Sequence, residues 1–144
     1  MKRIHANISE ETQDVKDRHR DQIDLLRNRL NLLSGTDKVM MTMYVENGNS
    51  FRQIARLLGV NQTSVARRMR ALTKRLTDGK YVTCLRNRER FTGGQMAIAK
   101  DYFLMGLSMR RIAEKRHQSY YHVRNTLKKV RSIVTTVERR SKQF

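Results

Sequence analysis

The sequence predicts an all-α protein in which an N-terminal helix is followed by two copies of a three-helix domain. Three observations support this class. The 144 residues include no proline, and 31% are charged while only 6% are aromatic, a composition typical of helical proteins. Apolar residues recur at intervals of three and four along most of the chain. Residues 34–76 also align without a gap with residues 92–134, which indicates an internal duplication.

Residues 1–33 are predicted to form an amphipathic helix for packing or dimerisation. Its apolar residues are Ile23, Leu26, Leu30 and Leu33 at a/d spacing, with Leu25 and Leu32 on the opposite face. Two apolar faces need two partners. One expected partner is the first three-helix domain, and the other is either a second copy of this helix, giving a homodimer, or another protein. Alternatively both faces pack within the chain, since about two heptads make only a marginal coiled coil.

At an offset of 58 residues, the identical residues of the two copies fall at expected turns, helix caps and core positions. The identical pairs are Gly35/Gly93, Tyr44/Tyr102, Gly48/Gly106, Ser50/Ser108, Arg52/Arg110, Ile54/Ile112, Ala55/Ala113 and Val65/Val123. Because these residue types set turns, caps and close helix contacts, their agreement indicates that the two copies share one architecture.

The first copy is predicted over residues 34–78. Its first helix is followed by a glycine stop and a serine cap, and the short helix FRQIARLL ends at Gly59. Val60 is expected to plug the core, and Asn61 to cap the third helix. The expected inward stripe of that helix is Val65, Met69, Leu72 and Leu76. Two short helices that cross at Ala55 and are joined by a glycine turn form a helix-turn-helix.

The second copy is predicted over residues 92–137. It has His117 where the first copy has Gly59, and histidine is among the residues that tolerate a positive φ. Residues 79–91 are interpreted as a short basic connector, and residues 138–144 as a basic tail without evident order.

The formal net charge of +18 favours a polyanionic partner. Residues 1–33 are nearly balanced, with seven basic and six acidic side chains, whereas residues 34–144 hold 24 basic and seven acidic ones. For such a chain the expected partner is nucleic acid, with an anionic membrane as the lesser candidate. No apolar run approaches the roughly 18 residues of a membrane span, and no signal peptide is evident. We therefore expect a cytoplasmic, nucleoid-associated protein.

Catalysis and metal binding are not expected. A single cysteine, Cys84, forms no internal disulfide or multi-thiolate zinc site, and the four histidines have no metal-binding spacing. No nucleophile and base pair, acidic dyad or glycine-rich phosphate loop can be assembled from the sequence. We expect neither an enzyme nor a cofactor.

The stretch NGNSFRQIARLLGVNQTSVARRMRALTKRL resembles region 4 of the sigma-70 family, especially the extracytoplasmic-function type, and LMGLSMRRIAEKRHQSYYHVRNTLKKV is similar. The resemblance covers residues 34–76 and, more weakly, 92–134. It implies recognition of promoter-like DNA and, through the docking habit of region 4, RNA polymerase as a partner. Residues 1–33 are too short to supply sigma region 2, so a complete initiation factor is not implied.

The helical wheel of each third helix separates core from reading face. In the first copy the candidate DNA-binding residues are Ser50, Arg52, Gln62, Thr63, Ser64, Arg67, Arg70 and Lys74. In the second copy they are Ser108, Arg110, Tyr120, Tyr121, Arg124, Asn125 and Lys128. Arg67 and Gln62 have donors suited to base edges, as does Asn125 for adenine, whereas Arg70 and Lys74 are expected at phosphates. The tyrosines fit thymine methyls, sugars or a protein interface equally well.

These patterns predict a sequence-specific regulator of transcription that binds double-stranded DNA through both copies. In the alternative, a sigma-like accessory factor, one copy binds DNA and the other docks on RNA polymerase or another protein. A structural RNA or chromatin-like binder would need only the charge.

Overall fold

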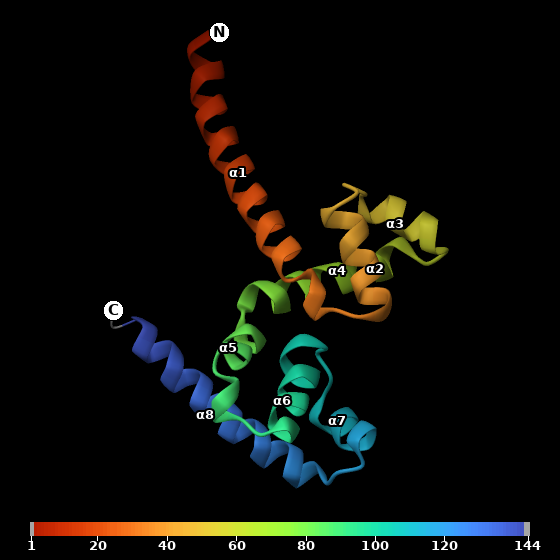
Figure 1. Ribbon diagram of the computed structural model, residues 1–144. Coiled ribbons are helices and arrows are strands. Elements are labelled where there is room, and N and C mark those ends of the chain that lie inside the picture. Colours follow the sequence, from red (N-terminus) through yellow and green to blue (C-terminus); the bar gives the residue numbers. More distant parts are fainter. Residues whose placement is uncertain (1, 143–144) are drawn as a thin grey trace. The chain divides into compact units, whose positions relative to one another are not determined.

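The computed structural model describes residues 2–142, and this part of the chain contains helices and turns but no strand. The prediction of an all-α protein is therefore confirmed (Figure 1). The chain divides after Thr73 into two compact units, which are described separately. The division falls within helix α4, Gln62–Asp78.

Helix α1, Lys2–Asn28, extends away from α2 and α3 of the first unit (Figure 1). Its C-terminal end is anchored because Leu26 is buried and the guanidinium of Arg27 donates a hydrogen bond of 3.1 Å to the carbonyl of Val45. The 3₁₀ turn η1, Leu30–Leu32, follows. Side chains 12–22 are all exposed, so from residue 12 onward only the last turns of α1 pack against the rest of the unit.

The rest of the first unit comprises α2, Gly35–Val45, α3, Phe51–Leu58, and the beginning of α4. A capping box starts α3: Ser50 Oγ accepts from the Gln53 N–H at 3.1 Å, and Gln53 Oε1 accepts from the Ser50 N–H at 2.8 Å. The helix ends at Gly59, which adopts the left-handed conformation at φ +68°. The predicted bounds of α3 are therefore correct.

The core of the first unit follows the predicted stripes. Its buried side chains include Met40, Met41, Val45, Ile54, Ala55, Val65, Met69 and Leu72. The expectation that Val60 plugs this core is wrong, because half of its surface is exposed. Its N–H closes the turn on the Ala55 carbonyl at 3.0 Å, and the fully buried Ile54 and Met69 fill the core without it.

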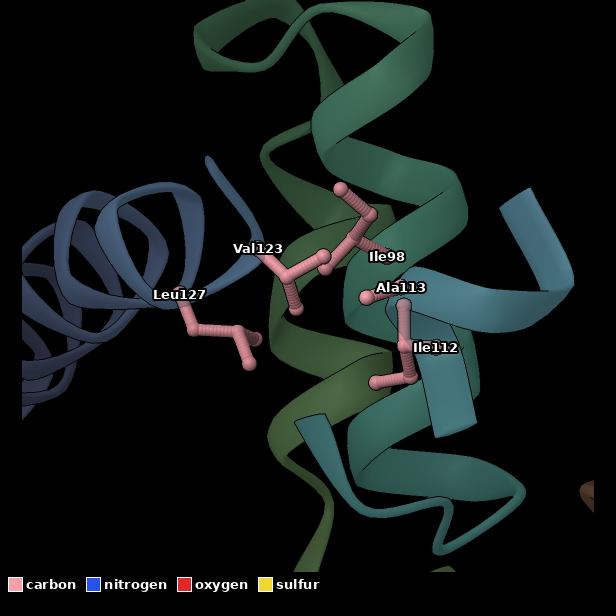
Figure 2. Close-up of a cluster of buried hydrophobic side chains, with 5 residues drawn as sticks. All are labelled: Ile98, Ile112, Ala113, Val123 and Leu127. Atoms are coloured by element: carbon pink, nitrogen blue, oxygen red, sulfur yellow. The ribbon is translucent and has the colours of Figure 1, made fainter. Parts of the chain in front are cut away.

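In the second unit, α6, Gly93–Ala99, continues into the π-helical turn η3, Lys100–Leu104, and is followed by α7, Met109–Arg116, and α8, Tyr120–Lys142. Figure 2 shows a cluster of buried side chains contributed by these helices. It comprises Ile98, Ile112, Ala113, Val123 and Leu127. The apolar stripe of α8 thus faces this cluster through Val123 and Leu127. Packing of α7 and α8 through this cluster leaves their polar faces exposed.

The connector and the tail differ from the prediction. Residues 79–91 form helix α5, Lys80–Arg86, and the 3₁₀ turn η2, Arg88–Arg90. Cys84 is fully buried in a second cluster with Ala99, Val130 and Val134. The inward stripe of α8 continues beyond Leu127 to Val130 and Val134, and α5 covers it. Residues 138–142 are likewise helical, as the last turns of α8.

Candidate nucleic-acid interface

The start of α4 is shaped by Asn61. Its Oδ1 accepts from the N–H groups of Thr63 at 2.7 Å and Ser64 at 3.4 Å, which satisfies donors that a helix start leaves open. The opposite, inward face of α4 is held in the core. The first turns of α4 are therefore capped at their start and exposed on their outer face. A surface hollow there is lined by Gln62, Thr63, Ala66, Arg67 and Arg70.

The basic residues of α4 divide into paired and unpaired side chains. Arg67, Arg70 and Lys74 are exposed, and within the described chain no acidic side chain forms an ion pair with them. Arg68 instead binds Asp37 of α2 through Nε at 2.8 Å and a terminal nitrogen at 2.6 Å. These hydrogen bonds raise the pKa of Arg68. The sequence reading missed this pair, although Arg68 lies beside the inward Val65 and Met69.

The residues predicted at the starts of α3 and α7 are exposed. Ser50 and Ser108 both use their hydroxyl oxygens as helix caps, with Ser108 Oγ accepting from the Arg111 N–H at 3.2 Å. Arg52 and Arg110 point away from the core with no ion-pair partner among the described residues. Both serines therefore organise the helix start, and each adjacent arginine keeps its donors free.

The start of α8 is capped by Ser119, whose Oγ accepts from the His122 N–H at 3.1 Å. The preceding turn contains His117 at φ +53°, in the left-handed region, as predicted. Tyr120 and Tyr121 are 47% and 71% exposed and meet edge to face with ring centroids 6.1 Å apart. Further along the same helix, Arg124, Asn125 and Lys128 are exposed as well.

Asp101 binds two basic residues of α7. It is only 1% exposed and accepts from Lys115 Nζ at 2.9 Å and Arg116 Nε at 2.6 Å. Burial raises the pKa of its carboxyl group, but the hydrogen bonds from Arg116 and Lys115 outweigh burial, so the pKa lies below its usual value. The sequence offered one signal for this contact, because Asp101 is an acidic residue among the inward positions that follow Ile98.

A further basic residue, Arg131, makes a contact within the second unit. The guanidinium of Arg131 lies 4.9 Å from the centre of the Tyr102 ring and also hydrogen-bonds the Tyr102 hydroxyl. Attraction between a cation and an aromatic face favours this placement. Arg131 therefore joins α8 to η3. It differs in this respect from the unpaired Arg124 and Lys128.

The candidates fall into two groups, one around α3 and α4 and the other around α7 and α8. Every predicted residue is exposed, from Ser50 to Lys74 in the first set and from Ser108 to Lys128 in the second. In the second unit a surface hollow joins α7 to the start of α8. It is lined by Arg110, Ala113, Glu114, Gln118 and Tyr120.

No helix in residues 2–142 is long and apolar enough to cross a membrane. Over the same residues, no group of three or more histidine, cysteine or acidic side chains is arranged to hold a metal ion.

Comparison with known families identifies one part of the chain. Residues 29–72 match the family model described as a helix-turn-helix domain. No curated protein and no solved structure matches the chain. The match spans α2, α3 and most of α4, so the first unit contains a helix-turn-helix domain. In such domains the second helix of the motif enters the major groove of DNA, which makes α4 the candidate recognition helix.

Proposed function

We propose that this protein is a sequence-specific, double-stranded DNA-binding regulator of transcription built on two helix-turn-helix domains similar to sigma region 4. The observation that carries the proposal is the row of unpaired cations on the exposed face of α4. Arg67, Arg70 and Lys74 remain without acidic partners in a domain type that places this helix in the major groove. Three unpaired surface charges add little to the stability of the fold, so their presence on one face of α4 is better explained by binding.

The second domain rests on the proposed duplication, which the hydrogen bonds of the main chain support. The bond from Asn49 N–H to Met43 O recurs, 58 residues later, from Leu107 N–H to Asp101 O, each at 3.0 Å. Three more bonds from a main-chain N–H to a main-chain carbonyl recur at the same offset. They are Ile54 to Ser50, repeated as Ile112 to Ser108; Val60 to Ala55, repeated as Gln118 to Ala113; and Val65 to Asn61, repeated as Val123 to Ser119. Equal backbone geometry at equal spacing supports α8 as a second recognition helix.

The two reading faces differ in chemistry. The first offers Gln62, Thr63 and Arg67, of which the arginine suits a guanine edge. The second offers two tyrosines and Asn125, which suits an adenine edge. We propose one helix-turn-helix domain over residues 34–78 and the other over 92–137. A composite site read by both would be asymmetric in sequence.

A second candidate function is favoured by apolar exposure in the first domain. Leu57 is 66% exposed and Val60 50% exposed, and Tyr120 and Tyr121 add an exposed aromatic pair in the second domain. Exposed aromatic and apolar side chains are typical of protein contacts. In this alternative, the protein is an accessory factor in which one domain binds DNA and the other docks on RNA polymerase.

Self-association through α1 is a separate proposal. The side chains of residues 12–22 are exposed and contact one another rather than another helix, as Gln13 and Arg20 do with Asp17, which leaves this stretch of α1 accessible to a second copy of the chain. For the protein as a whole we propose action at the nucleoid, without catalysis or a cofactor, because duplex recognition by side chains needs neither.

The deciding experiment is selection of bound duplexes from a random pool by the full chain, followed by competition. A selected site should outcompete random duplex by roughly a thousandfold or more if the protein is a specific regulator. If both domains read DNA, the selected site should contain two blocks of preference within about 20 base pairs, two helical turns. Equal competition by random duplex would reject specific recognition. One block only, unchanged by Asn125→Ala, would favour polymerase docking.

A further inference from the structure

A shallow hollow between α6 and α8 gathers hydrogen-bond donors at the far edge of the reading face, where Lys128 lies. It is lined by Gln95 of α6 and by Lys128, Lys129, Ser132 and Ile133 of α8. Both lysines are exposed, and no acidic side chain within residues 12–142 pairs with either. The hollow therefore carries two uncompensated positive charges.

The amide of Gln95 is oriented by the helix cap. Its Oε1 accepts from the Thr92 N–H at 2.9 Å, while the Gln95 N–H donates to Thr92 Oγ1 at 3.1 Å. Because the oxygen is engaged, the NH₂ group is the part of the amide left to donate. The hollow therefore favours the binding of an anion, because it presents two ammonium groups, this amide and the Ser132 hydroxyl.

The corresponding place in the first unit already contains an anion. In the proposed duplication, Gln95 corresponds to Asp37, whose carboxylate is buried and holds Arg68 through two hydrogen bonds. Lys129 corresponds to Ala71. The carboxylate at this junction of the first unit thus binds Arg68, whose counterpart in the second unit is the uncharged Thr126. In the second unit Gln95 brings no anion to the junction, and Lys128 and Lys129 have no acidic partner among the described side chains.

We propose that this hollow binds a backbone phosphate of the duplex that α8 reads, an inference that rests on the function proposed above. Lys128 and Lys129 lie more than two helical turns beyond Tyr120, where a recognition helix inserted by its N-terminal end meets the DNA backbone rather than base edges. A phosphate held there adds affinity for every sequence and fixes the register of α8 on the duplex.

The sharpest test is Gln95→Glu. Glutamate is a favoured residue at this position of a capping box, so the start of α6 and the melting temperature should be preserved. The new carboxylate would sit against the two lysines, as an internal anion, and exclude phosphate. We expect duplex affinity to fall roughly three- to tenfold on all sequences, and the slope of log K against log salt to decrease by about 0.9.

Two further variants complete the test. Lys129→Ala should produce the same loss of salt slope without adding an acid. Ser141→Glu changes the net charge by the same amount as Gln95→Glu, at an exposed position in the last turn of α8, and should leave the slope at its wild-type value. Melting temperatures of all three variants separate loss of binding from loss of folding.

The outcomes separate this inference from the function on which it rests. Wild-type affinity and slope in both Gln95→Glu and Lys129→Ala would overturn the phosphate site while leaving DNA recognition intact. A loss confined to the selected sequence would overturn it as well, since it would mark a base contact. Micromolar binding of inorganic phosphate, with duplex affinity unaffected by Lys129→Ala, would assign the hollow to a free ion. Absence of duplex binding by the wild type would reject the function itself.

Discussion

Arg68 and Asp37 join α4 to α2 through two hydrogen bonds, of 2.8 and 2.6 Å, while the neighbouring Arg67 points outward with no ion-pair partner among the described residues. Two consecutive arginines on one helix thus have different surroundings. Arg68 holds the three-helix domain together, and Arg67 is available to a ligand.

The first prediction compares these two arginines for stability. Arg68→Ala should lower the free energy of unfolding by about 1–2 kcal/mol, because the buried Asp37 carboxylate loses both donors while half-exposure of the arginine limits the cost. Arg67→Ala should change it by less than about 0.5 kcal/mol. Denaturant titration of both variants measures the difference. Equal stability of the two would show that the ion pair contributes nothing measurable.

The second prediction concerns base reading by α4. Arg67→Ala should weaken binding to the selected site by about 1–3 kcal/mol and flatten the preference at one base position. Lys74→Ala should weaken binding to all sequences alike, because it removes a phosphate contact. Repeating the selection with each variant is the measurement. Uniform loss in both variants would reassign Arg67 to the backbone.

The third prediction concerns the turns before α4 and α8. His117 occupies the left-handed region at φ +53°, and Gly59 does so at φ +68°. His117→Gly should raise the free energy of unfolding by up to about 1 kcal/mol, since glycine adopts this conformation without strain. Gly59→Ala should lower it by about 1–2 kcal/mol, purely through the backbone, because a Cβ there would meet nothing within 4 Å. Thermal or denaturant unfolding checks both signs, and destabilisation by His117→Gly would contradict the argument.

The fourth prediction is the pH dependence set by Asp101. Because the folded protein holds the pKa of this carboxyl group below its usual value, its stabilisation is present above the unfolded pKa of about 4 and is lost as the pH falls through the folded value. Asp101→Asn should lower stability at neutral pH by roughly 1–3 kcal/mol and flatten the acid limb of the stability curve. Glu114→Gln, at an exposed and unpaired acid, serves as the control. An unchanged acid limb in Asp101→Asn would assign acid unfolding to other groups.

The helices that carry the proposed function were predictable from local residue patterns. Ser50 and Gly59 mark the ends of α3 through a side-chain cap and a left-handed turn, both of which depend only on neighbouring residues. The inward stripe from Val65 to Leu72 follows from helical periodicity, and the outward cations follow as its complement. These features are local, so the amino-acid sequence alone determined them.

Tertiary packing decided which polar residues face one another and what covers the far end of α8. Asp37 meets Arg68 across 31 positions and Asp101 meets Arg116 across 15, so neither pairing leaves a periodic signal. The segment around Cys84 reads as a basic connector because its arginines dominate the composition. It folds as α5 because Val130 and Val134 extend the apolar stripe of α8 beyond Leu127, and burying that stripe stabilises a helix that local charge alone did not predict.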